Sequence, residues 1–145
     1  MKTDKPYDYE INGKVDAPNK FGDLVASDFV FAINRNSTSG VRRGGITALI
    51  DSDKGTGWIA AYPSKRKSAE DILAAVHNVK GSETIKGWYS DGAPELHAVC
   101  RTFGIRHDTS DPHRSVTNGA IERCNRTVIE GARCLPFQSG MPYKY

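Results

Sequence analysis

The sequence predicts an α/β fold, in which a five-stranded mixed sheet is flanked by helices in the order βββ-α-β-α-β-α. The chain of 145 residues has the length of a single domain. Its first half contains three β-rich apolar segments with short connections, which is typical of an antiparallel meander. Its second half alternates helical periodicity with short apolar runs, which is typical of helices packed on a sheet.

The first three strands are expected close together in the sequence. Residues 23–33, DLVASDFVFAI, are β-branched and aromatic and predict a largely buried strand. Residues 46–52 and 56–63 predict the second and third strands, which a short Asp-Lys-Gly turn joins. Residues 34–45 between the first two strands have the composition of a turn with a basic tip.

Two helices and two short strands are expected next. Ser68, with Asp71 three residues later, predicts the start of a helix that Gly81 ends. Residues 85–91 predict the fourth strand, and Pro94 can occupy the first turn of the second helix. The apolar positions expected to be buried on these two helices are Ala69, Ile72, Leu73, Val76 and Val79, then Leu96, Val99, Cys100 and Phe103.

The C-terminal third predicts a short strand, a loop and a last helix. The strand covers residues 105–107, and residues 108–119 lack periodicity and are expected to form a loop. The last helix is expected from about 118 to 134, with Pro136 breaking it. Its expected buried stripe is Ile121, Cys124, Val128, Ala132 and Leu135.

The domain organisation follows from these elements. Residues 1–21 are expected to be a linker or disordered arm, residues 22–136 the core, and residues 137–145 a truncated tail.

No apolar run approaches the roughly 20 residues of a membrane helix, and the N-terminus lacks a secretory signal. The three cysteines form no CxxC pair, so free thiols and an intracellular setting are expected. A net charge of +3 permits a polyanionic partner.

Three carboxylates are candidates for a catalytic centre. Asp28 lies within the first strand among apolar neighbours, where an ionised group is costly unless it is paired or binds a metal. Asp91 lies at the end of the fourth strand, and Glu122 lies one turn into the last helix. Convergent carboxylates are tolerated when a divalent cation such as Mg²⁺ neutralises them. Two such ions support an in-line phosphoryl displacement.

Each carboxylate also has a structural interpretation. Asp91 followed by Gly92 is a common turn pair, and Glu122 stands four residues before Arg126, the favourable order for a surface ion pair. Asp23 is a rival of Asp28 for the first position. The two are an odd number of residues apart, so they point to opposite faces of a regular strand.

Three segments resemble the catalytic cores of retroviral and long-terminal-repeat retrotransposon integrases. These are WYSDGAPEL (88–96), TNGAIERCNRTVIEGAR (117–133) and ITALIDSDKGTGWIAAYP (46–63). With the first strand, the resemblance covers residues 22–133. It implies a ribonuclease H-like core that carries out DNA 3′-end processing and strand transfer. It also implies that Asp28, Asp91 and Glu122 are catalytic and bind Mg²⁺ or Mn²⁺, as two ions.

Some features depart from the pattern of that family. Only 31 positions separate Asp91 from Glu122, a few fewer than is usual. The turn after Asp91 reads Gly-Ala-Pro, where the family often has Asn-Gly. The zinc module and the basic domain that flank integrase cores are missing from this sequence. The chain is therefore expected to be a fragment of a longer Pol polyprotein.

The resemblance also implies partners. DNA is the expected substrate, a homodimer or higher oligomer the expected assembly, and the nucleus the expected place of action, with no membrane association. The candidate cations for phosphate contact are Lys65, Arg66, Lys67, Arg114, Arg123, Arg126 and Arg133. Two alternatives stay open: a catalytically decayed or domesticated remnant that binds DNA or itself, and a ribonuclease H-type nuclease.

Overall fold

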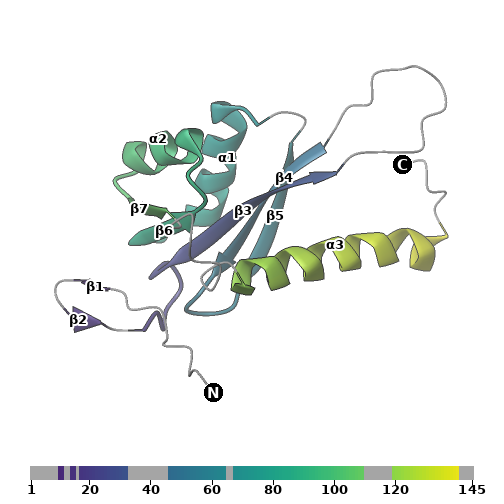
Figure 1. Cartoon of the computed structure of the whole chain (residues 1–145), viewed down its shortest axis with the longest axis horizontal. Coiled ribbons are helices and arrows are strands. Elements are labelled where there is room, and N and C mark those ends of the chain that lie inside the picture. Colours follow the sequence, from purple (N-terminus) through teal and green to yellow (C-terminus); the bar gives the residue numbers. More distant parts are fainter. Residues whose placement is uncertain are drawn as a thin grey trace.

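The computed structural model describes residues 10–11, 14–15, 17–32, 46–64, 67–109 and 119–140. At its centre lies a five-stranded mixed sheet with the strand order β5-β4-β3-β6-β7 (Figure 1). The middle strand β3 pairs antiparallel with β4 and parallel with β6. The strands are β3 (Val25–Ala32), β4 (Ile46–Asp53), β5 (Ile59–Ser64), β6 (Gly87–Ser90) and β7 (Arg106–Thr109).

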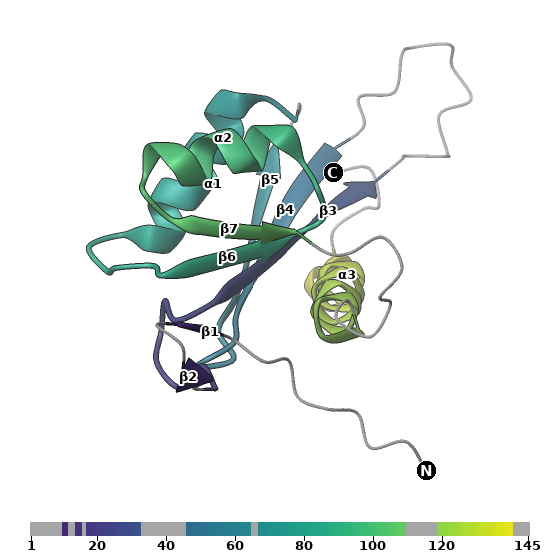
Figure 2. The same cartoon turned by 60° about the vertical axis from the view of Figure 1, so that its left-hand side comes forward.

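Helices cover both faces of this sheet. Figure 2 shows α1 and α2 together on one face and α3 across the other. The three helices are α1 (Ala69–Lys80), α2 (Pro94–Thr102) and α3 (Gly119–Ser139). The predicted α/β class, the order of elements and the five-stranded mixed sheet are therefore confirmed, and each predicted strand lies within a few residues of the observed one.

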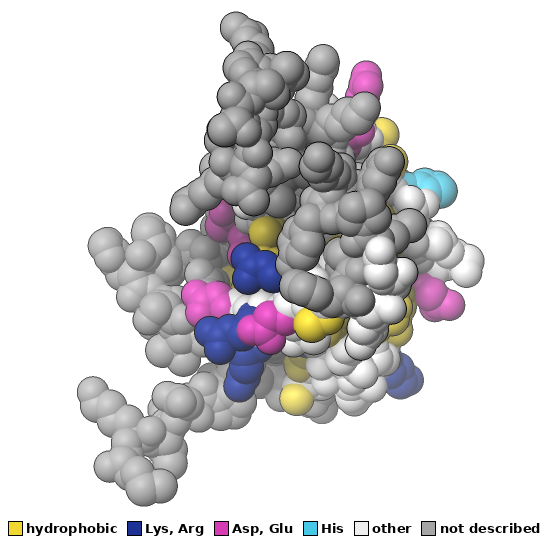
Figure 3. All heavy atoms as spheres, turned by 90° about the vertical axis from the view of Figure 1, so that its right-hand side faces the viewer, with side chains coloured by type: hydrophobic (Ala, Val, Ile, Leu, Met, Phe, Trp, Pro, Cys, Tyr) yellow, Lys and Arg dark blue, Asp and Glu magenta, His cyan; other side chains and the backbone are white. Residues whose placement is uncertain are grey.

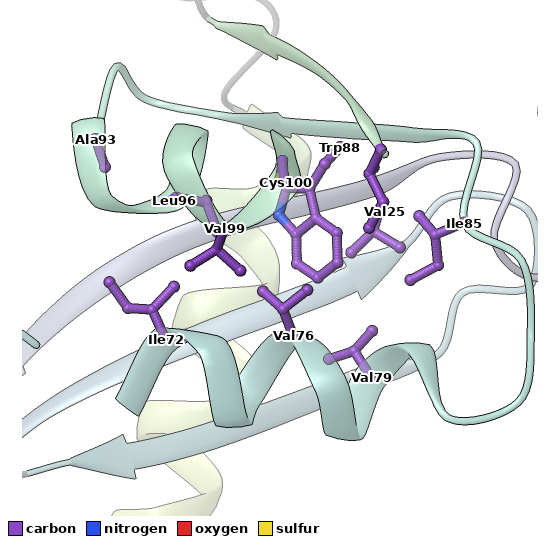
Figure 4. Close-up of a cluster of buried hydrophobic side chains, with 11 residues drawn as sticks. Val25, Ile72, Val76, Val79, Ile85, Trp88, Ala93, Leu96, Val99 and Cys100 are labelled. Atoms are coloured by element: carbon purple, nitrogen blue, oxygen red, sulfur yellow. The ribbon is translucent and has the colours of Figure 1, made fainter. Parts of the chain in front are cut away.

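The main hydrophobic core lies between the sheet and the pair α1 and α2. Trp88 of β6 is fully buried there and lies among side chains from both helices, including Val76 and Val99 (Figure 4). Val25 of β3 belongs to the same cluster, whereas its neighbours Leu24 and Ala26 belong to a second cluster. Since side chains alternate along a strand, Asp28 shares the face of Ala26, which is the face toward α3.

Helix α1 starts as predicted. The Oγ of Ser68 accepts a hydrogen bond from the backbone N–H of Asp71 at 3.1 Å, and Gly81 ends the helix with a positive φ of 50°. Its buried residues are Ile72, Ala75, Val76 and Val79. The prediction was wrong for Ala69 and Leu73, which are exposed, because the buried face is centred on the stripe that includes Ala75.

Helix α2 confirms both its predicted start and its predicted buried residues. Pro94 is its first residue, and Leu96, Val99 and Cys100 are buried while Phe103 packs against the same cluster. Burial raises the pKa of the Cys100 thiol to about 12, and the nearby Asp51 adds to this effect. Cys100, the half-buried Cys124 and the exposed Cys134 are all free thiols, as expected.

Helix α3 differs from the prediction. It does not break at Pro136 but continues to Ser139. A proline withholds one hydrogen bond from the carbonyl four residues earlier, here that of Ala132, and Ala132 is exposed, so water can take the place of the lost donor. Ala132 and Leu135 are exposed rather than buried, because the C-terminal half of α3 extends beyond the sheet (Figure 1).

A short ladder of two strands lies outside the main sheet. The expected arm 1–21 contains a short antiparallel ladder of β1 (Glu10–Ile11) with β2 (Lys14–Val15), which the sequence did not predict. The expected turn 34–45, and residues 110–118 of the expected loop, lie outside the described residues. Among the helices that the structure describes, none is long and apolar enough to cross a membrane.

Candidate active site

Asp28 and Asp91 lie side by side where two parallel strands part. The pairing of β3 with β6 ends at Ser27 opposite Ser90, and the two aspartates are the next residues along each strand. Neighbouring strands are about 4.8 Å apart. Alternation along β3 directs the Asp28 side chain to the face covered by α3, whereas Asp91 is the first residue after β6. The register of the sheet thus places the backbones of two aspartates that are 63 positions apart in the sequence directly after the same residue pair.

Helix α3 contacts the first of these carboxylates. The Nδ2 of Asn125 donates a hydrogen bond of 2.6 Å to Oδ2 of Asp28, and the backbone N–H of Phe29 lies 2.8 Å from Oδ1. Asp28 is only half-buried, while Asp91 is exposed. The carboxylate that the sequence placed in a buried strand is therefore held by an amide from the facing helix.

Glu122 lies on the same side of α3 as Asn125. The two residues are three positions apart, a spacing that makes their side chains neighbours at about 5–6 Å between Cβ atoms. Glu122 is exposed, and no ion pair joins it to Arg126 in the described part of the chain. The third carboxylate thus stands one turn of helix from the residue that holds Asp28.

The three carboxylates do not form a closed cluster. Within the described ranges, no three His, Cys, Asp or Glu side chains stand close enough together to hold one metal ion. The donor set still suits a hard cation, because Mg²⁺ prefers carboxylate oxygens and accepts water for its remaining positions. Asp91 and Glu122 are both exposed, so rotation of their side chains is not hindered by core packing.

Asn125 is a functional candidate that the sequence analysis missed. Its Nδ2 is bonded to Asp28, while its Oδ1 is buried and has no hydrogen-bond partner among the described residues. A buried amide oxygen without a partner is costly in a folded protein. The sequence could have indicated Asn125, because it stands three residues after Glu122 and so lies on the same face of the helix.

Asp23, the other candidate for the first catalytic position, is paired with a lysine. It precedes β3 and its Oδ1 lies 2.6 Å from Nζ of Lys86, while Oδ2 accepts hydrogen bonds from the backbone N–H groups of Asn19 and Lys20. The Lys86 ammonium, together with the two N–H groups, lowers the pKa of Asp23. This carboxylate fixes the chain before β3.

A second acid lies behind the site, on the opposite face of β3. Asp51 of β4 is fully buried, and its Oδ1 accepts a hydrogen bond from the hydroxyl of Ser27, which in turn accepts one of 2.6 Å from Nε1 of Trp88. The other oxygen of Asp51 has no partner among the described residues. Burial raises the pKa of Asp51 to about 7, although the Ser27 hydroxyl opposes this effect.

The predicted phosphate contacts fall into three groups. Arg123, Arg126 and Arg133 are exposed on α3, the helix that covers Asp28. Lys67 lies on the other side, 3.9 Å from Glu95 and 4.2 Å above the ring of Phe29. The remaining candidates, Lys65, Arg66 and Arg114, lie outside the described residues.

A further cation near α3 was not predicted. Lys54 is half-buried directly after β4, and desolvation lowers its pKa, while Cys124 opposes this effect and Arg123 adds to it. On the face shown in Figure 3, Lys and Arg side chains lie next to Asp and Glu side chains. The described surface there has mixed charge.

Comparison with known proteins identifies what this arrangement is similar to. No protein-family model matches the chain. Its sequence is 28% identical over 102 residues to the Pol polyprotein of Feline endogenous virus ECE1, and this alignment covers 64% of the chain. It is 26% identical over 160 residues, covering 99% of the chain, to the retrovirus-related Pol polyprotein from transposon TNT 1-94 of Nicotiana tabacum. It is 31% identical over 104 residues, 67% of the chain, to that from transposon RE1 of Arabidopsis thaliana.

Solved structures identify the fold. The catalytic core domain of BIV integrase matches with a TM-score of 0.52 at 16% identity, over 72% of this chain and 65% of that one. The HTLV-2 integrase catalytic core domain, in complex with magnesium in a trimeric form, matches with a TM-score of 0.60 at 15% identity, over 81% and 73%. A chain of the simian T-cell lymphotropic virus intasome with PP2A regulatory subunit B56γ matches with a TM-score of 0.60 at 18% identity, over 83% and 43%.

The chain therefore has the ribonuclease H-like fold of retroviral integrase catalytic cores. Its relatives in sequence are Pol polyproteins of retroviruses and transposons, which confirms the predicted resemblance. The chain spans only 10%, 12% and 7% of the length of the three polyproteins named above.

Proposed function

We propose that this chain is the catalytic core of an integrase, which processes the 3′ ends of DNA and transfers them into a target strand. The observation that carries the proposal is the position of the carboxylates. Asp28 and Asp91 each directly follow the last residue pair that joins β3 to β6, and α3 packs over Asp28 with Glu122 one turn from the contact. The similarity to Pol polyproteins and the shared fold support the same activity.

In this proposal Asp28, Asp91 and Glu122 would hold one or two Mg²⁺ or Mn²⁺ ions. When bound, such ions activate an attacking oxygen and stabilise the leaving oxygen in a phosphoryl displacement. The magnesium complex of the HTLV-2 core, which has the same fold, supports this choice of metal. Side-chain rotation of the exposed Asp91 and Glu122 toward Asp28 would complete the donor set.

The residues of the chain itself supply position and charge. Asn125 donates an N–H to Oδ2 of Asp28, and the backbone N–H of Phe29 lies at Oδ1, so the two donors fix the plane of that carboxylate. The exposed guanidinium groups of Arg123 and Arg126 lie on the same helix, where they would contact phosphates of a DNA strand. Such contacts give binding that depends strongly on salt and little on base sequence.

Replacing Asp91 by asparagine tests the activity. Loss of a metal-binding carboxylate removes several kcal/mol of transition-state stabilisation, about a thousandfold in rate. The assay measures Mn²⁺-dependent nicking and joining of labelled DNA ends by the wild-type chain, Asp91→Asn and the control Glu83→Gln, an exposed acid in the turn after α1. Equal rates for wild type and Asp91→Asn would exclude the assigned role.

Metal binding provides a second measurement that does not depend on turnover. A ligand that binds the folded state raises the unfolding temperature by mass action. Millimolar Mn²⁺ should stabilise the wild type and Glu83→Gln but not Asp91→Asn. Equal thermal shifts in all three proteins would contradict a metal site at Asp91.

A non-catalytic function is the second candidate, favoured by the absence of a closed three-ligand cluster among the described residues. A remnant that binds DNA or itself would bind DNA equally well with and without divalent metal and would cut neither DNA nor an RNA–DNA hybrid. Faster cleavage of the hybrid than of DNA ends would instead indicate a ribonuclease H-type nuclease. Assembly into dimers or larger oligomers and action in the nucleus are part of the integrase proposal.

A further inference from the structure

A row of polar contacts leads from α2 to the residue that ends β6. The guanidinium Nη2 of Arg101 lies 3.5 Å from Nε2 of His97, and Nδ1 of His97 lies 3.1 Å from Nδ1 of His107. Nε2 of His107 lies 2.8 Å from Oγ of Ser90, which donates a 2.7 Å hydrogen bond to the main-chain carbonyl of Asp91. We call Arg101, His97, His107 and Ser90 the histidine relay.

One pair of tautomers satisfies every contact in the histidine relay. The Ser90 hydroxyl proton is used on the carbonyl of Asp91, so Oγ must accept from His107, which therefore carries its proton on Nε2. Nδ1 of His107 is then a lone pair and accepts from Nδ1–H of His97. The remaining nitrogen of His97, Nε2, accepts from Arg101. All donors in the row point toward Asp91.

The surroundings of His107 favour the neutral ring that this arrangement requires. Burial, followed by the neighbouring His97, lowers the pKa of His107, and only Asp108 opposes the shift. Arg101 on α2 adds positive charge, while Arg106 on β7 lies 3.1 Å from Asp108 and offsets it. A proton on both rings would set two N–H groups against each other across the contact between the Nδ1 atoms.

We propose that His107 is a positioning residue for Asp91, acting through Ser90 and oriented by His97 and Arg101. Ser90 is 1% exposed, so its hydroxyl has no access to solvent as an alternative partner. Holding the carbonyl of Asp91 fixes the backbone at the point where the strand ends and the turn begins. The inference rests on the proposed function, because a fixed backbone at Asp91 matters only if the Asp91 carboxylate binds the metal.

The tautomers can be measured directly, without activity or metal. In the full chain labelled with ¹⁵N-histidine, imidazole nitrogen shifts at pH 7.5 distinguish an Nδ1–H from an Nε2–H ring. The expected result is His107 as the Nε2–H tautomer and His97 as the Nδ1–H tautomer. Finding both rings as Nε2–H, or both averaging between forms, would overturn the histidine relay.

A pair of substitutions separates positioning from general stability. The amide nitrogen of glutamine reaches the place of Nε2 and can still donate to Ser90, whereas that of asparagine lies near Nδ1 and cannot. The N–H of Gly92 shares a peptide group with the Asp91 carbonyl, so its amide chemical shift reports on the Ser90 contact. This chemical shift should be unchanged in His107→Gln and altered in His107→Asn. The control is His77→Asn on the exposed side of α1. An unchanged Gly92 resonance in His107→Asn would refute the positioning role.

Metal affinity then links the backbone to the carboxylate. Loss of a residue that orients a metal ligand costs about 10–100-fold in affinity. His107→Asn should weaken Mn²⁺ binding about tenfold, with His107→Gln and His77→Asn close to wild type. If the wild type bound no Mn²⁺ while the tautomers and the Gly92 shift held, the proposed function would fail and the backbone role would stand. If wild type and His107→Asn bound Mn²⁺ equally, the link to Asp91 would fail alone.

Discussion

Asp51 makes the stability of the fold depend on pH in a direction opposite to that of a salt-bridged carboxylate. Burial raises its pKa from 3.8 to about 7, so the folded state favours the neutral acid. The free energy of unfolding therefore contains no charge penalty from Asp51 below pH 3.8. As the pH rises from there toward 7, Asp51 ionises in the unfolded state first, and the fold loses stability. Above that range the charged form costs the folded state about 4 kcal/mol.

Asparagine is the substitution that isolates this charge. In Asp51→Asn the side-chain oxygen still accepts from Ser27, while an amide replaces the carboxylate oxygen that has no partner. An unpaired buried amide costs about 1–3 kcal/mol, which is less than the cost of the charge above pH 7 and more than its cost near pH 4. The variant should thus be more stable than wild type at pH 8, by about 1–3 kcal/mol, and no more stable at pH 4.

Urea unfolding from pH 4 to pH 8 measures this difference directly. Wild type and Asp51→Asn share every other titrating group, so the pH dependence of their difference in unfolding free energy belongs to Asp51. Glu83→Gln, which removes an exposed acid from the turn after α1, is the control for the loss of a carboxylate at the surface rather than in the core. A difference between wild type and Asp51→Asn that stays constant over this range would refute the assignment of a buried, neutral acid.

Three further predictions concern the site, the core and a helix end. Asn125→Ala should reduce DNA joining while leaving the far-ultraviolet circular dichroism unchanged, because it removes the donor that holds Asp28; joining at the wild-type rate would contradict this. Leu135→Ser should change the unfolding free energy by less than about 0.5 kcal/mol, since Leu135 is 64% exposed, whereas Leu96→Ala should cost about 2–5 kcal/mol in the core. Ser68→Ala should cost about 1 kcal/mol in urea unfolding through loss of its cap, and an unaltered midpoint would exclude that role.

The parts of the fold that depend on local chemistry were predictable from the sequence. Ser68 starts α1 because its hydroxyl satisfies a free N–H, and Pro94 starts α2 because it needs no hydrogen bond there. The burial of α3 was not predictable in the same way. Its apolar periodicity continues to Leu135, but the sheet beneath it ends earlier, and the extent of a neighbouring layer is not encoded in the helix's own sequence.

The residues of the candidate site also differ in whether their own segment is enough to identify them. Asp28 could be found because an acid among apolar strand residues is costly, and that argument needs only its own segment. Asn125 and Asp51 could not, since each gains its meaning from a partner distant in the sequence: Asp28 for the first, Ser27 for the second. An asparagine on a helix and an aspartate near a strand end are common in solvent-exposed positions.

The register of β3 decides what both acids can do. Ser27 faces the core, where it contacts Asp51 and Trp88, and the next residue, Asp28, faces α3 and bonds to Asn125. Because side chains alternate, a slip of one residue would bury Asp28 in the core and expose Ser27. The buried hydrogen bonds of Ser27 oppose that slip, so the contacts on the core face of the sheet stabilise the alignment that turns Asp28 toward α3 on the opposite face.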